Sequence, residues 1–148
     1  MALRAGGVVI QGIDHIGIAV HTIEEARGFW ESLGLAIEAI EVVESEGVRV
    51  AIIPCGGSRI ELLEPTREDS PIARFIAKRG PGLHHVCLTS DGLAADDVAL
   101  RAAGVRLLRD RPTRGAGGCW IQFVHPASAG GVLVELSEPP GEGPEGGA

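Results

Sequence analysis

The sequence predicts an α+β fold in which two β-α-β-β-β modules form a curled mixed sheet around a metal site. A histidine-bearing strand followed by a capped helix occurs at residues 14–33 and again at residues 84–103. Ile-Glu-Leu-Leu-Glu-Pro at residues 60–65 has its counterpart in Val-Glu-Leu-Ser-Glu-Pro at residues 134–139. Such self-similarity indicates an internal structural repeat. The 22 glycines and 3% aromatic residues also favour a protein of strands and turns.

The first copy begins with a strand at residues 13–20, where Ile16, Ile18 and Val20 share one face. Thr22 and Glu25 form a capping box at the start of an amphipathic helix that ends at Gly34. Three strands are expected to follow, at residues 36–43, 48–53 and 59–63.

A linking helix is expected next, with Ser70 as its cap and Pro71 at its first position. The second copy begins with a strand at residues 82–88, and Asp91 is expected to cap a helix that ends at Gly104. Short strands are predicted near Arg106 and at residues 119–124 and 132–136.

We therefore expect one domain over residues 10–138. Module one covers about 10–66, the linking helix about 70–80 and module two about 82–138. Residues 139–148 are rich in Pro, Gly and Glu and are predicted to be disordered.

Composition excludes several classes of function. The net charge of −7 argues against a nucleic-acid-binding face and against a membrane-surface role. We expect no signal segment and no membrane span, because no apolar run is long enough. Cys55, Cys87 and Cys119 have no C-x-x-C spacing and are interpreted as reduced thiols of a cytoplasmic protein.

The candidate site rests on the repeat. His84 and His85 are adjacent in a strand, so they face opposite sides of the sheet. Superposing the two copies aligns His15 with His85 and Glu61 with Glu135.

If the copies curl face to face, two imidazoles and two carboxylates converge. That donor set suits a divalent transition metal ion in an open, catalytic geometry. His84 is interpreted as a packing residue, His125 as a loop residue and His21 as solvated.

Three stretches resemble the methylmalonyl-CoA epimerase family of the vicinal oxygen chelate superfamily. They are Ile13 to Val20, the Asp-Ser-Pro-Ile-Ala sequence at residues 69–73 continuing to Gly-Leu-His-His at residues 82–85, and Gly131 to Leu136. The middle stretch is the most specific to the epimerases. The resemblance extends from about residue 13 to residue 138 and implies a fold of paired β-α-β-β-β modules.

By this resemblance, the metal ligands are His15, His85 and Glu135, with Glu61 as the fourth. The resemblance favours Co²⁺, and the same residues would accept Zn²⁺, Ni²⁺ or Mn²⁺. One member of the family has a second catalytic glutamate on the strand that follows a Gly-Val pair. This chain has Val50 there instead.

The implied reaction inverts the α-carbon of methylmalonyl-CoA, a CoA thioester, through an enolate stabilised by the metal. Inversion removes a proton on one face and delivers one on the other. Glu135 is assigned as one base and Glu61 as the second. Arg109, Arg111 and Arg114 lie in a Gly-rich loop and are candidates for binding the CoA phosphates.

Three other functions fit the same residues. A glyoxalase I-type lyase acting on a glutathione hemithioacetal also uses two histidines and two glutamates. An iron-dependent ring-cleaving dioxygenase would use only His15, His85 and Glu135. A non-catalytic small-molecule binding protein of this fold would need no metal. A homodimer is expected.

Overall fold

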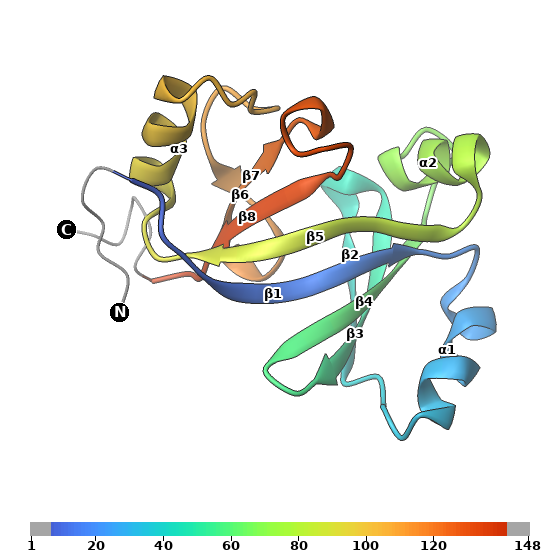
Figure 1. Cartoon of the computed structure of the whole chain (residues 1–148). Coiled ribbons are helices and arrows are strands. Elements are labelled where there is room, and N and C mark those ends of the chain that lie inside the picture. The colour runs from blue at the N-terminus through green and yellow to red at the C-terminus, as the bar shows by residue number, and fades with distance from the viewer. Residues whose placement is uncertain (1–6, 142–148) are drawn as a thin grey trace. The chain divides into compact units, whose positions relative to one another are not determined.

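The computed structural model describes residues 7–141, and each module has the predicted β-α-β-β-β order. The described chain divides into two compact units, one of residues 15–84 and one of residues 7–14 with 85–141. Figure 1 traces the elements in chain order. The strands are β1 (Ile10–Ala19), β2 (Ala39–Val43), β3 (Val48–Cys55), β4 (Ser58–Pro65), β5 (Gly82–Ser90), β6 (Thr113–Arg114), β7 (Trp120–Val124) and β8 (Val134–Glu138). The α-helices are α1 (Ile23–Ser32), α2 (Pro71–Arg79) and α3 (Leu93–Ala102), and the 3-10 turns are Glu44–Glu46, Ala116–Gly118 and Pro126–Ser128.

In the unit of residues 15–84, the strands lie in the order β2-β3-β4-β1. β1 and β4 are parallel, while the other two pairs are antiparallel. Helix α1 packs through Ile23 on the face that carries Leu62. Helix α2 packs through Ile72 on the opposite face, against Val50 and Leu63. The sheet therefore has a separate apolar cluster on each face.

In the other unit, the strands lie in the order β5-β8-β7-β6, with β5 and β8 parallel. Helix α3 covers one face through Leu93, which packs with Val124 and Leu136. Both units thus combine parallel and antiparallel pairs, as expected for a mixed sheet. Each copy of the repeat places its first and last strands side by side.

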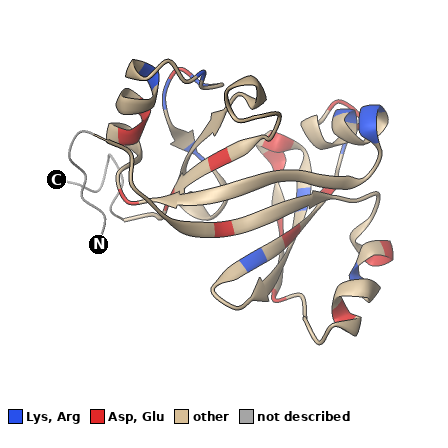
Figure 2. Ribbon diagram, viewed as in Figure 1, with Lys and Arg blue, Asp and Glu red and all other residues tan. Residues whose placement is uncertain are grey.

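The helix starts agree with the sequence at two of three positions. The Thr22 and Ser70 hydroxyl oxygens accept from the N–H groups of Glu25 and Ala73, both at 3.1 Å. Lys78 and Arg79 occupy the last turn of α2, at its other end. Figure 2 shows Lys and Arg gathered there. Cations there complement the helix dipole.

The prediction that Asp91 caps α3 is wrong. Gly92 is the N-cap and supplies no side-chain hydrogen bond. The Asp91 carboxylate instead accepts from the Gln11 amide at 3.1 Å.

The Glu-Pro sequence that ends each copy explains how α3 starts without a side-chain cap. Glu138 Oε1 accepts from the N–H of Leu93, the first residue of α3, at 2.7 Å. Glu64 Oε1 accepts from the N–H of Ile23, the first residue of α1, at 2.8 Å. A helix leaves its first N–H groups without partners inside the helix, and a carboxylate there also suits the dipole. Glu64 and Glu138 thus connect the last strand of each module to the start of that module's helix by a hydrogen bond.

One smaller difference concerns the second copy. The strand predicted near Arg106 is wrong: Leu107 makes only an isolated bridge to Val124, and β6 lies at Thr113–Arg114. Residues 139–141 are exposed, and the rest of the predicted disordered tail lies outside the described residues.

In the part of the chain that is described, no helix has the length and apolar character needed to cross a membrane.

Replacing Glu138 tests its role at the helix start. Glu138→Met leaves the Leu93 N–H without an acceptor in a buried place, and we expect it to lower the free energy of unfolding by about 2 kcal/mol. Glu138→Gln keeps an acceptor oxygen and is expected to cost less than about 1 kcal/mol. Urea unfolding followed by circular dichroism measures both. Equal costs for the two variants would show that the hydrogen bond is not what Glu138 contributes.

Candidate active site

Strand alternation places His15 and Glu61 on one face of their sheet. His15, Gly17 and Ala19 share a face of β1, and Gly17 lies opposite Glu61 of β4 in the parallel register. His15 Nε2 lies 3.4 Å from Glu61 Oε1, and the two side chains are 9% and 12% exposed. An imidazole and a carboxylate are therefore held together with little access to water.

His85 and Glu135 form the equivalent pair in the other unit. Cys87, two residues beyond His85, lies opposite Glu135 in the parallel register of β5 and β8. His85 Nε2 lies 3.1 Å from Glu135 Oε1, and these side chains are 8% and 12% exposed. The repeat detected in the sequence is thus also a repeat of side-chain geometry.

The structure groups the four predicted site residues into two pairs, one in each unit. In both pairs it is Nε2 of the histidine that faces the carboxylate. Neutral imidazole nitrogen and carboxylate oxygen are common ligands of divalent transition metals. The same groups can also accept and release protons. The donor chemistry of each pair therefore fits a divalent ion.

Arg59 is a site residue that the sequence reasoning missed. It precedes Glu61 by two positions in β4 and is the register partner of His15 in β1. Its Nη2 lies 3.2 Å from Glu61 Oε2 and 3.5 Å from His15 Nδ1. The spacing of Arg59 and Glu61 could have identified it, because residues two apart in a strand share a face.

Val50, at the position where one family member has a glutamate, lies in an apolar environment. Val50 is 6% exposed and belongs to the apolar cluster beneath α2. It lies opposite Leu63 in the register of β3 and β4. Its neighbours are apolar, so position 50 contributes to the core of its unit rather than to proton transfer.

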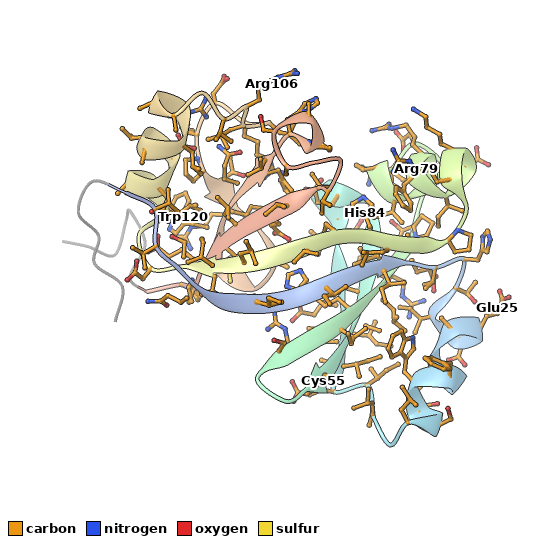
Figure 3. All side chains as sticks on the ribbon, in the orientation of Figure 1. Glu25, Cys55, Arg79, His84, Arg106 and Trp120 are labelled. Atoms are coloured by element: carbon orange, nitrogen blue, oxygen red, sulfur yellow. The ribbon has the colours of Figure 1, made fainter. Side chains whose placement is uncertain are left out.

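The remaining histidines have the roles expected of them. His84 stacks edge-on against Phe75 of α2, with ring centroids 5.0 Å apart, and Figure 3 shows it beneath that helix. His125 Nδ1 accepts from the Ala127 N–H at 2.9 Å in a turn. His21 is exposed.

The three arginines of the Gly-rich loop lie in different environments. The Arg109 guanidinium stacks 5.0 Å from the centre of the Phe123 ring and contacts the Thr113 hydroxyl. Arg114 stacks 4.6 Å from the centre of the Trp120 ring and donates to the Gly118 carbonyl at 2.9 Å. Arg111 is exposed.

Arg109 stacks on a residue that is paired with Glu135 in the sheet. Phe123 lies directly opposite Glu135 in the antiparallel register of β7 and β8, so both side chains share one face. The Arg109 main chain is also anchored. Its N–H donates to Gln122 Oε1 at 3.2 Å, and its carbonyl accepts from Gln122 Nε2 at 2.9 Å. Gln122 is fully buried and donates to Asp97 at 2.7 Å.

Comparisons with known proteins identify relatives of the chain. The model of the Glyoxalase/Bleomycin resistance protein/Dioxygenase superfamily matches residues 14–123. The uncharacterized protein YqjC of Bacillus subtilis is 44% identical over 88% of this chain and 94% of its own length. The ethylmalonyl-CoA/methylmalonyl-CoA epimerase of Cereibacter sphaeroides is 36% identical over 88% of this chain and 99% of its own length.

A solved structure extends the likeness to the fold. It is a variant of the Streptomyces coelicolor methylmalonyl-CoA epimerase in complex with 2-nitronate-propionyl-CoA. The TM-score is 0.85 at 39% identity, covering 90% of this chain and 98% of that one. The predicted fold class is confirmed.

Proposed function

The chain belongs to the Glyoxalase/Bleomycin resistance protein/Dioxygenase superfamily and is an enzyme of the epimerase class, and we propose that it inverts the α-carbon of methylmalonyl-CoA with the help of a divalent metal ion. The observation that carries the proposal is a His–Glu pair in each copy of the repeat, in a chain alike over most of its length to epimerases of CoA thioesters.

We propose that His15, Glu61, His85 and Glu135 are ligands of one ion. Each pair is almost buried, and in each pair Nε2 is directed to the carboxylate. The repeat gives the two pairs equivalent positions in the two modules, which supports assigning them to a common ion.

The bound ion would stabilise the negative charge that develops on the thioester oxygen when the α-proton leaves. Glu135 takes the proton from one face of the carbon, and Glu61 delivers a proton to the other face. Each carboxylate has two oxygens, so one can hold a proton while the other remains in contact with a neighbouring group. The low exposure of both glutamates limits competition from water.

Glu61 is favoured over any group on β3 as the second base. Position 50 is an apolar core residue, and Ile52 lies opposite Glu61 in the register of β3 and β4. Glu61 occupies the position in module one that Glu135 occupies in module two. Inversion needs two proton-transfer groups, and these two glutamates meet that need with equivalent placement in the two units.

Three further properties complete the proposal. The ion is Co²⁺, with Zn²⁺, Ni²⁺ and Mn²⁺ as ions that the same donors accept. The protein is a homodimer. It acts in the cytoplasm.

A glyoxalase I-type reaction is the second candidate, because two histidines and two glutamates also suit that chemistry. It differs in substrate: a glutathione hemithioacetal in place of a CoA thioester. Assays of both substrates on the same metal-loaded sample separate the two functions.

Replacing Glu135 tests the proposed reaction. We expect Glu135→Gln to lower the rate of epimerisation at least 100-fold, because an amide cannot accept the α-proton. Deuterium incorporation at the α-carbon of methylmalonyl-CoA in D₂O measures the reaction. Glu138→Gln is the matched control, since its side chain faces the α3 side of the same strand and anchors that helix.

If Glu135→Gln epimerises the substrate at the wild-type rate, Glu135 is not a base of the reaction. Turnover of the hemithioacetal by the wild-type protein, without deuterium exchange into methylmalonyl-CoA, would favour the lyase instead. Metal content measured on the same samples shows whether a loss of rate comes from a lost ion.

We also propose that Arg109 binds a phosphate or carboxylate group of the substrate. Its stacking on Phe123 and its anchored main chain hold it near Glu135 along the sheet. Arg111 and Arg114 are exposed and supply additional positive charge in the same loop.

We expect Arg109→Gln to raise KM for methylmalonyl-CoA about tenfold, because the variant loses one charge-assisted contact with the substrate. The KM of the wild-type enzyme should also rise with salt, and that dependence should weaken in the variant. Arg106→Gln is the control, because Arg106 projects away from its unit in Figure 3. An unchanged KM in Arg109→Gln, or an equal change in both variants, would contradict the assignment.

A further inference from the structure

Arg59 places a positive charge directly among two of the proposed metal ligands. Its Nη2 lies 3.2 Å from Glu61 Oε2 and 3.5 Å from His15 Nδ1. The other atoms of the pair face each other, with His15 Nε2 3.4 Å from Glu61 Oε1. The guanidinium and the imidazole therefore share one carboxylate.

The other copy of the repeat lacks this arginine. Arg59 precedes Glu61 by two positions, and the residue two positions before Glu135 is Leu133. The repeat keeps the histidine and the glutamate but replaces the guanidinium with an apolar side chain. Because the second unit forms its His85–Glu135 pair with a leucine at the equivalent position in the sequence, the pair does not require an arginine there.

The contacts of Arg59 oppose the binding of an ion. A guanidinium only donates hydrogen bonds, so a hydrogen bond from Arg59 to His15 Nδ1 requires the tautomer with a lone pair on Nδ1. The proton of a neutral imidazole is then on Nε2, the atom that faces Glu61. If Nε2 held the ion, the imidazole proton would have to be on Nδ1, the atom that contacts the guanidinium. The ion also repels the arginine charge.

Solvent reaches part of the Arg59 side chain. Its side chain is 40% exposed, in contrast to the nearly buried pair that it contacts. The proposed substrate carries a carboxylate on the carbon that inverts, and arginine binds carboxylates through two parallel hydrogen bonds.

We propose that Arg59 competes with the metal ion for Glu61 and His15, and that ion binding frees its guanidinium to bind the carboxylate of the substrate. Arg59 is thus a specificity residue that links metal loading to recognition of a malonyl-type acyl group. This inference rests on the proposed function, since it takes His15 and Glu61 as ligands.

The test is the affinity for Co²⁺, measured by calorimetric titration of the metal-free protein, together with steady-state kinetics. Arg59→Leu copies the residue of the other module. We expect it to bind Co²⁺ about tenfold more tightly, because a competing cation is removed. Its KM for methylmalonyl-CoA should rise at least tenfold, because the carboxylate loses its partner.

Two more variants isolate the cause. Arg59→Lys keeps the charge but loses the planar fork, so we expect a Co²⁺ affinity close to that of the wild type with a raised KM. Arg27→Leu removes the same charge from the surface of α1, where Arg27 pairs with Glu31. It should change neither quantity. Circular dichroism confirms that each variant is folded.

The inference and the proposed function fail in different ways. If wild-type protein binds Co²⁺ and epimerises the substrate but Arg59→Leu binds Co²⁺ with unchanged or weaker affinity, only the inference is overturned. If wild-type protein binds no divalent ion, the metal-dependent function is overturned and the inference with it. If Arg59→Leu binds Co²⁺ more tightly but its KM for methylmalonyl-CoA is unchanged, the proposed contact between Arg59 and the substrate is overturned.

Discussion

The alternation of side chains along a strand is the constraint on which the whole arrangement depends. In each module, one face of the first and last strands carries the histidine and the glutamate, and the other face packs against the helix. A shift of one residue in the register would turn the polar pair toward the helix and the apolar residues away from it. The Glu-Pro ends resist such a shift, because Glu64 and Glu138 each bond the first N–H of their module's helix.

Much of this was visible in the sequence, because the features that mattered were periodic or repeated. Spacing of two residues identified the faces of β1, β4, β5 and β8, and the repeat paired His15 with His85 and Glu61 with Glu135. Thr22 and Ser70 were predictable because their caps bond within three residues. The start of α3 was not, because its first N–H is met by Glu138, a residue distant in the chain. Arg106 looked like part of a strand, but only Leu107 bridges to Val124.

The surroundings of the two His–Glu pairs were less predictable than the pairs themselves. Arg59 and Glu61 contact each other because they share a face, yet an arginine in a strand is most often solvated. Its contact with His15 depends on the parallel register of β1 and β4, which sequence alone does not set. The two modules are therefore alike in their His–Glu pairs and unlike in what surrounds them. Unequal surroundings suit a reaction in which two equivalent carboxylates have opposite tasks, one taking a proton and one giving it.

The central claim is that the two His–Glu pairs hold a single ion, and metal stoichiometry tests it most directly. Protein loaded with Co²⁺, freed of excess metal by gel filtration and measured by mass spectrometry should contain one ion per chain. His15→Ala and His85→Ala should each lose that ion, since either removal leaves the shared site short of a nitrogen ligand. Two ions per chain in the wild type, or a full ion retained by either variant, would show that the pairs act separately and would contradict the account.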